Sequence, residues 1–180
     1  MEDGKEIYLI LSILIFYSVM ETNSLFEFTN INCTSIDVKV GEYEYCYLKS
    51  INRTYKYVSG KYKVHQNSLS SVKLTFMMWK RLNGYKPFLF NVTVDACRFL
   101  KNPKSSPVIK YIYESFTSYS NMNHSCPFSG DVIIDKLPVG FLNHRATEIL
   151  PIPEGSYLIE FHFASLNSRF ARTQVFFTIS

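Results

Sequence analysis

The sequence has 180 residues, 47% of them hydrophobic, with 19 Lys and Arg against 15 Asp and Glu and a formal net charge of +4. This length suits one ordinary domain with its own core, and the hydrophobic content excludes a disordered, highly charged chain. The lysines are spread along the chain rather than clustered, which is typical of a solvated surface, and attraction to an anionic surface or an acidic lipid headgroup is the less favoured alternative. We expect no nucleic-acid partner, because the N-terminal segment predicts export and an exported protein rarely meets one.

The N-terminal segment predicts export. Residues Ile7 to Met20 are almost purely apolar, a run of about fourteen that matches a signal-peptide core and is shorter than the roughly 20 residues that span a bilayer. Thr22 and Ser24 supply small residues before a cleavage point. We therefore expect a signal peptide over residues 1–24, one mature domain over residues 25–180, and no integral membrane segment after cleavage. The first six residues are net acidic instead of basic, so an uncleaved membrane anchor is the alternative.

Most of the mature chain has the period of two that is typical of half-buried strands, and it is rich in Tyr, Phe, Val and Ile. The pair Asn83-Gly84 predicts a hairpin turn between two of these runs. We expect strands at Phe26–Cys33, Tyr43–Ile51, Thr54–His65, Val72–Trp79, Phe88–Asp95, Asp131–Ile134, Tyr157–Ala164 and Val175–Ile179.

One segment has helical spacing instead. Apolar residues recur between Val108 and Tyr119, after Ser106 as a cap and Pro107 at the first helical position. The sequence thus predicts one short helix around residues 107–119 in a mainly β protein. The expected architecture is an antiparallel β-sandwich or β-cup of immunoglobulin-like type.

The chain has four cysteines, Cys33, Cys46, Cys97 and Cys126, without CxxC or Cys/His ligand spacing, so we expect no metal site and no cofactor. Three pairings are open to four cysteines in an oxidising compartment. We favour Cys33 with Cys46, which would clasp neighbouring antiparallel strands, and Cys97 with Cys126, which would close a loop around the predicted helix.

Four sequons of the N-x-[ST] type support export independently of the signal peptide. N-glycosylation is predicted at Asn32, Asn52, Asn91 and Asn123. Asn91 shares a strand face with Thr93 and Asp95, opposite the face of Phe88 and Phe90, so its glycan would point to water.

Aromatic residues make up 16% of the chain, more than a sandwich of this size needs for filling. Those that alternate along strands are candidates for the wall of an apolar pocket, although an alternating aromatic is more often plain core. The candidate wall residues are Phe76, Met78, Phe88, Phe90, Tyr157, Phe161 and Phe163, with Phe116 on the helix as a lid.

We do not expect an enzyme. His65, His124, His144 and His162 are scattered, and neither GxSxG nor HExxH occurs. The carboxylates worth checking are Asp95, Asp131 and Asp135, for which a turn cap or surface solvation is the expected role.

Several short motifs occur together in one order along the mature chain. They include Phe28 to Cys33, Tyr45 to Lys49, Asn52 to Lys56, Tyr85 to Leu89, Val94 to Cys97, Asn121 to Pro127 and Pro153 to Gly155. In this order they resemble the insect family DUF1091, whose function is unknown. More remotely, Cys126-Pro127-Phe128 and Pro153-Glu154-Gly155 are similar to the lipid-recognition (ML) sandwich proteins of the ganglioside-activator type.

The resemblance implies a cup-like sandwich whose sheets can part to admit an apolar ligand, and a link to chemosensory secretions. We therefore expect a secreted glycoprotein that binds or carries a lipid or hydrocarbon. The alternative is an extracellular interaction protein with a filled core, which binds another protein, a receptor or a glycan through its tyrosine-rich, basic surface.

Overall fold

The computed structural model describes residues 25–52, 55–65, 69–149, 152–166 and 168–180. The predicted signal peptide and the second and third positions of the Asn52 sequon lie outside these ranges. Within the described part of the chain, no helix is long and apolar enough to cross a membrane.

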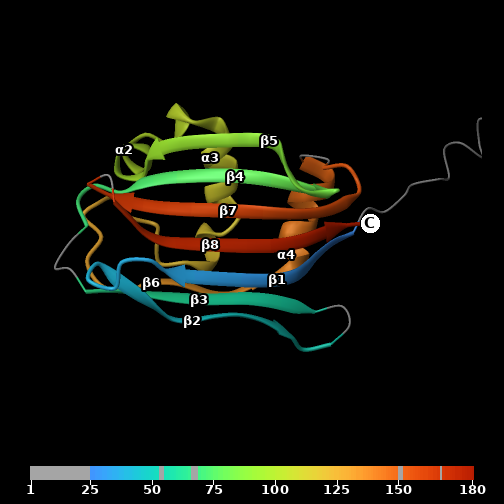
Figure 1. Cartoon of the computed structure of the whole chain (residues 1–180), viewed down its shortest axis with the longest axis horizontal. Helices are drawn as coiled ribbons and strands as arrows, with labels where there is room; N and C mark the ends of the chain where they lie inside the picture. The colour runs from blue at the N-terminus through green and yellow to red at the C-terminus, as the bar shows by residue number, and fades with distance from the viewer. Residues whose placement is uncertain (1–24, 53–54, 66–68, 150–151, 167) are drawn as a thin grey trace, which may run out of the picture.

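Eight strands form two antiparallel sheets (Figure 1). The five-stranded sheet has the order β1-β8-β7-β4-β5, and the three-stranded sheet has the order β2-β3-β6. The prediction of a mainly β, sandwich-like fold is thus confirmed. The strands are β1 (Phe26–Ser35), β2 (Gly41–Ser50), β3 (Lys56–Val64), β4 (Lys73–Leu82), β5 (Gly84–Asp95), β6 (Val132–Pro138), β7 (Gly155–Ser165) and β8 (Ser168–Ile179).

Strands β4 and β5 form the predicted hairpin. Its turn is at Asn83-Gly84, where Gly84 has a φ of 86°, a conformation that glycine adopts without steric cost. Further along, Met77 pairs with Asn91 but Trp79 pairs with Pro87, so three residues of β5 lie opposite one residue of β4. Leu89, in the middle of this bulge, has a φ of 57° and is exposed.

Helical segments are more numerous and shorter than expected. The described helices are α2 (Ala96–Lys101), α3 (Pro107–Glu114) and α4 (Val139–His144), with short 3-10 turns at Pro103–Ser105 and Thr117–Tyr119 and a π-helical turn at Arg145–Ile149. The predicted helix is present as α3, and α2 and α4 are two further short helices that the sequence did not predict. Helices of six residues carry too few turns to produce a periodic pattern.

The predicted helix around 107–119 ends early, at Glu114. The hydroxyl of Ser115 donates to the carbonyl of Tyr111 at 2.9 Å, and that of Thr117 donates to the carbonyl of Tyr113 at 2.5 Å. Such side-chain bonds compete with the helical backbone pattern. Pro107 begins the helix as expected, whereas Ser106 makes no side-chain capping bond.

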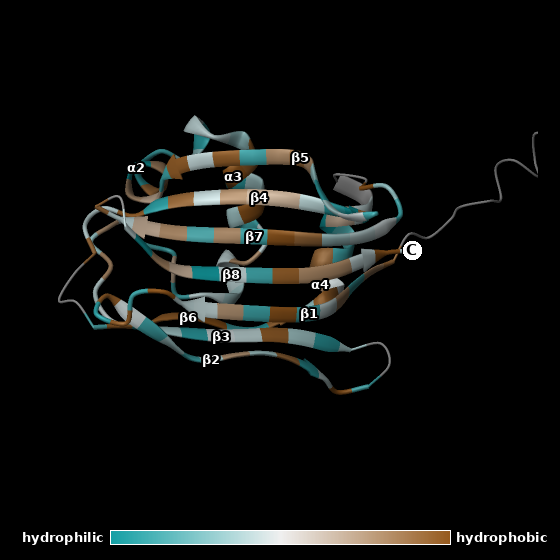
Figure 2. Ribbon diagram, in the orientation of Figure 1, coloured by the Kyte–Doolittle hydropathy of each residue, from teal (hydrophilic) through white to brown (hydrophobic). Residues whose placement is uncertain are grey.

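Helices α3 and α4 pass behind the strands of the five-stranded sheet in Figure 1, so they cover one of its faces. We call this the inner face. The three-stranded sheet packs on the same side, since Val58 of β3, Leu137 of β6 and Ile109 of α3 share one core cluster with Phe76 of β4. Among the described residues no element lies over the opposite, outer face in this view, and teal polar positions recur along its strands (Figure 2).

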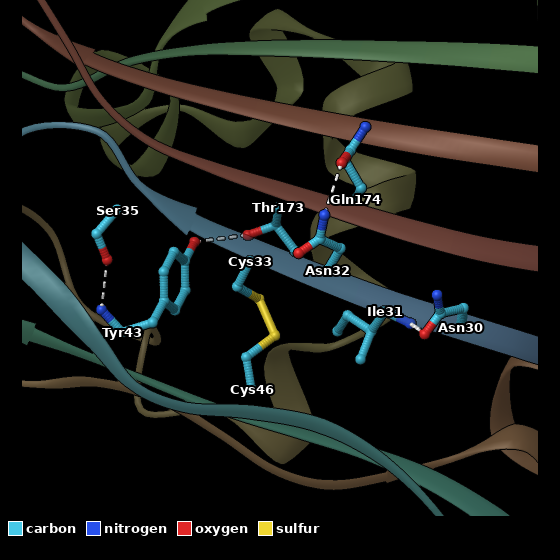
Figure 3. Close-up of a disulfide and its surroundings, with 9 residues drawn as sticks. All are labelled: Asn30, Ile31, Asn32, Cys33, Ser35, Tyr43, Cys46, Thr173 and Gln174. Atoms are coloured by element: carbon cyan, nitrogen blue, oxygen red, sulfur yellow. Dashed lines mark hydrogen bonds between the residues drawn. A yellow bond between two sulfur atoms is a disulfide. The ribbon is translucent and has the colours of Figure 1, made fainter.

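The disulfide Cys33–Cys46 joins the two sheets, from β1 to β2, with a Cα–Cα distance of 6.1 Å (Figure 3). Beside it, the hydroxyl groups of Tyr43 on β2 and Thr173 on β8 are hydrogen-bonded at 2.6 Å. The sequence predicts that this disulfide joins two neighbouring antiparallel strands. Instead its strands belong to different sheets, and the covalent bond holds the sandwich together at one edge.

The disulfide Cys97–Cys126 joins α2 to the segment before β6, with a Cα–Cα distance of 5.3 Å. The loop that it closes contains α3, as the sequence suggested. Both bridges of the structure therefore join the cysteines that the sequence analysis favoured. Because α3 lies within this closed loop, the bridge restricts where the helix can lie.

Replacing Cys33 and Cys46 by serine should lower the free energy of unfolding by about 3 kcal/mol, because the unfolded chain regains the freedom of the closed loop. Removing the Cys97–Cys126 bridge should cost about 0.7 kcal/mol more, since its sequence separation is 29 rather than 13 residues. Urea denaturation followed by circular dichroism measures both losses. A larger loss from the shorter loop would contradict this entropic account.

Burial raises the pKa of Tyr43 to about 12, against a smaller lowering effect of its bond to Thr173. The unfolded chain therefore loses this proton at lower pH than the folded chain does, and stability falls as the pH rises from about 10 towards 12. We expect Tyr43→Phe to show a shallower fall of the free energy of unfolding over this window than the wild type, measured by urea denaturation at pH 9 and at pH 11. Equal slopes would contradict the assignment to Tyr43.

Candidate apolar binding site

The inner face of the five-stranded sheet is lined by aromatic and aliphatic side chains that alternate along each strand. On β7, Tyr157, Ile159 and Phe161 point inwards, as their membership of the core cluster shows. The same alternation places Phe76 and Met78 of β4 beside them, because Phe76 pairs with Phe161 and Met78 with Ile159.

One end of this face is tightly packed. Tyr157, Phe177 and Phe28 are 0%, 1% and 1% exposed. The ring of Tyr157 is stacked on Phe177 with centroids 5.3 Å apart, and Phe26 is stacked on Phe177 at 4.8 Å. The hydroxyl of Tyr157 donates to the carbonyl of Pro153, so even its polar atom has a partner inside the protein. No ligand could pass between Tyr157, Phe177 and Phe28 without displacing core residues.

The middle of the same face is less completely buried. Ile159, Phe161 and Val175 lie on the central strands β7 and β8 and pack against the core, yet each remains partly exposed. A residue at such a position is ordinarily covered on all sides, because neighbouring strands flank it and the helices lie above it. Part of the surface of these apolar residues is therefore left accessible by the cover.

The cover over this region comes from α3 and the turn after it. Ile109 is 2% exposed and anchors the helix, while Ile112, Tyr113 and Phe116 are half-buried against the core. The rings of Tyr113 and Phe116 meet edge to face, with centroids 5.8 Å apart. Phe116 follows the end of α3 and is thus held by a turn and not by a continuous helix.

Arg145 ties this cover together. Its guanidinium lies over the ring of Tyr111 at 4.5 Å and donates to Ser115 Oγ and to the carbonyl of Tyr111, each at 2.8 Å. It also forms an ion pair with Glu114 at 3.7 Å. The last turn of α3 is therefore bonded to the segment that follows α4, a contact that no sequence pattern predicted.

The structure brings most of the predicted wall residues together. Phe76, Met78 and Tyr157 are fully buried core, and Phe163 packs in a second cluster around Phe170, away from the others. The half-buried candidates that pack on the first cluster are Phe88, Phe90, Phe116 and Phe161. Ile159, Val175 and Lys80 were not among the predicted residues, although all three follow the same period of two.

The four sequon asparagines, Asn32, Asn52, Asn91 and Asn123, are all exposed. Asn32 on β1 and Asn91 on β5 stand at opposite edges of the outer face. Asn32 Nδ2 donates to Gln174 Oε1 at 3.2 Å (Figure 3). Glycosylation requires an accessible asparagine side chain, and all four predicted sites meet this requirement.

Polar side chains cross the outer face in one row. Strand register aligns Asn32, Gln174, Glu160 and Asn91 from one edge of the sheet to the other, with the apolar Met77 between the last two. Gln174 Nε2 donates to Glu160 Oε1 at 2.7 Å, and the Glu160 side chain is only 13% exposed. The outer face is therefore not a simple solvated surface, because its central polar groups are largely shielded by their neighbours.

Beside this row, several buried nitrogen atoms have no hydrogen-bond partner within the described residues. They are both ring nitrogens of His162, Arg172 Nε and Trp79 Nε1. His162 Nε2 lies 3.9 Å from Glu160 Oε2, within ion-pair range but too far for a hydrogen bond. Burial lowers the pKa of His162, and the charges of Arg169 and Arg172 lower it further, although Glu160 opposes them.

The other polar residues singled out in the sequence have structural roles. Asp95 caps α2 by accepting from the Arg98 amide at 2.9 Å, and Asp131 pairs with Lys61 at 3.0 Å. Asp135 is exposed. In the described part of the chain, no three His, Cys, Asp or Glu residues cluster so that they could hold a metal ion.

Comparison with protein families gives one result. Residues 74–159 match the family described as protein of unknown function (DUF1091). We call these residues the DUF1091 segment. The segment runs from β4 into β7 and so includes the β4–β5 hairpin, all three described α-helices and the Cys97–Cys126 bridge. A search of curated proteins finds no match to the chain. The remoter similarity to lipid-recognition proteins remains a prediction.

Proposed function

We propose that the chain is a secreted glycoprotein that binds a small apolar ligand, a lipid or a hydrocarbon, between the five-stranded sheet and its helical cover. The observation that supports this function is the partial exposure of Ile159, Phe161 and Val175 on the inner face of central strands. These side chains are apolar, so a ligand that displaces water from them would be apolar too.

The energetics are adequate for such a ligand. Each buried methylene contributes about 0.8 kcal/mol, so a chain of about ten would contribute about 8 kcal/mol before the cost of ordering it. The cover is made of short helical segments and not of hydrogen-bonded strands. Such a cover can move to admit a ligand at a lower cost than separating two paired strands.

Export is part of the same proposal. Two disulfides are typical of an oxidising compartment, and the accessible asparagines of the sequons suit a glycoprotein. Both features are independent of the apolar N-terminal segment.

Filling the interior should abolish binding. Val175→Phe adds a ring beside Ile159, where solvent now reaches, and we expect it to weaken binding of the uncharged fluorophore N-phenyl-1-naphthylamine by at least about tenfold while the protein stays folded. Val38→Phe is the matched control, because it makes the same substitution at a position that is 58% exposed. Fluorescence titration measures both. Equal binding by the two variants would contradict a site at Val175.

Native mass spectrometry of protein secreted from a eukaryotic host tests the proposal without a probe. Extra mass in the hydrocarbon or lipid range, lost on mild activation, would support a carrier. Bare glycoprotein that also takes up neither long-chain fatty acids nor hydrocarbons would refute it.

The outer face favours a second function, that of an extracellular interaction protein. Three basic residues of this face, Lys73, Arg169 and Arg172, outweigh its acidic residues Glu160 and Asp95. An acidic glycan provides complementary negative charge.

Under this second function, Arg172→Gln should elute from immobilised heparin at lower salt than the wild type, because it removes a partly shielded charge at the centre of the face. Arg81→Gln, which removes an exposed arginine of β4, is the control and should shift elution less. Equal shifts would mean that only the overall charge of the protein matters.

A further inference from the structure

Lys80 lies on the inner face, two residues after the buried Met78 on β4. Its ammonium group is 5.6 Å from the ring centroid of Phe88 and 5.4 Å from that of Tyr157. It also donates to the carbonyl of Glu154 at 3.0 Å. The charged end of this lysine is thus held against two aromatic rings at one end of the apolar interior.

The chain makes room for this conformation at Gly155. A Cβ atom added there would come within 2.9 Å of Lys80 Cε and 3.4 Å of Lys80 Nζ. Gly155 also has a φ of +146°, which side chains other than glycine rarely adopt. The close passage of the Lys80 side chain therefore depends on glycine at this position.

Lys80 differs in its charge environment from the other partly buried lysines of the described chain, Lys56, Lys61 and Lys110, each of which forms an ion pair. Lys56 pairs with Glu27, and Lys61 pairs with Glu44 and Asp131. Among the described residues, no carboxylate lies within ion-pair distance of the Lys80 ammonium. One carbonyl and two ring faces leave N–H donors of the ammonium without an anionic acceptor.

The position of Lys80 fits one end of an elongated ligand. Lys80 pairs with Tyr157, four residues along the strands from the pair of Phe76 with Phe161. At about 3.3 Å per residue this separation is about 13 Å, which is the length of a medium-chain alkyl group. The half-buried rings of Phe88 and Phe90 on β5 lie along this path, and Phe90 is 6.2 Å from Phe76.

We propose that Lys80 binds the anionic headgroup of the ligand, so that the ligand class is an amphiphile with a carboxylate at one end and an alkyl chain at the other. This inference rests on the proposed apolar binding function and specifies its ligand. The alkyl chain runs along Phe88 and Phe90 towards Phe161. The carboxylate accepts hydrogen bonds from the Lys80 ammonium and is the anionic partner that this lysine lacks in the protein.

The test compares two ligands of equal chain length, dodecanoate and 1-dodecanol, as competitors of N-phenyl-1-naphthylamine on the intact secreted protein. In the wild type, dodecanoate should displace the fluorophore at a concentration about tenfold lower than 1-dodecanol. In Lys80→Met this preference should disappear, while displacement by 1-dodecanol stays as in the wild type. That second result also shows that the variant is folded.

Arg81→Met is the matched control. Arg81 is the next residue of β4, so its exposed side chain points to the outer face, and the variant removes the same charge without touching the inner face. This variant should keep the preference for dodecanoate. Loss of the preference in both variants would mean that general surface charge, and not Lys80, attracts the carboxylate, and would overturn the inference.

The remaining outcomes separate the two proposals. If the fluorophore and both competitors fail to bind the wild type, the apolar binding function is refuted, and this inference is refuted with it. If 1-dodecanol competes as well as dodecanoate, the binding function stands and the role of Lys80 is refuted. The wild-type comparison decides this even if Lys80→Met does not fold.

Discussion

A three-stranded sheet cannot cover a five-stranded one, and this mismatch shapes the rest of the molecule. At about 4.8 Å per strand the two sheets are about 14 Å and about 24 Å wide, so a strip of the larger inner face needs another cover. The segment between β5 and β7 supplies it, with α3, α4 and the turns around them. On the central strands of the larger sheet, Ile159, Phe161 and Val175 stay partly exposed.

Much of the fold could be predicted from the sequence because period-two alternation survives in nearly every strand, and because Asn83-Gly84 is a strong hairpin signal. The short helices could not, since α2 and α4 have six residues each and their positions follow from tertiary packing and the Asp95 cap. Lys80 was missed for another reason. A lysine on a strand is ordinarily solvated, and only the structure shows that the rings of Phe88 and Tyr157 surround this one.

The extent of the DUF1091 segment is informative when placed on the structure. The segment contains the helical cover and the site residues Lys80, Phe88, Phe90, Phe116 and Ile159. The Cys33–Cys46 bridge and the strands β1, β2 and β3 lie outside it. Most of the candidate site therefore belongs to the part of the chain that matches the family. The fold itself leaves the function open, because one sandwich can serve many ligands.

The bulge in β5 has a consequence for the behaviour of the protein at high concentration. β5 is an edge strand, and a regular edge offers unpaired N–H and C=O groups to any other strand that meets it. Here Pro87 lacks an N–H, and the kink at Leu89 interrupts the regular spacing of the backbone groups a few residues further on. The longest exposed edge of the larger sheet thus resists strand-to-strand aggregation.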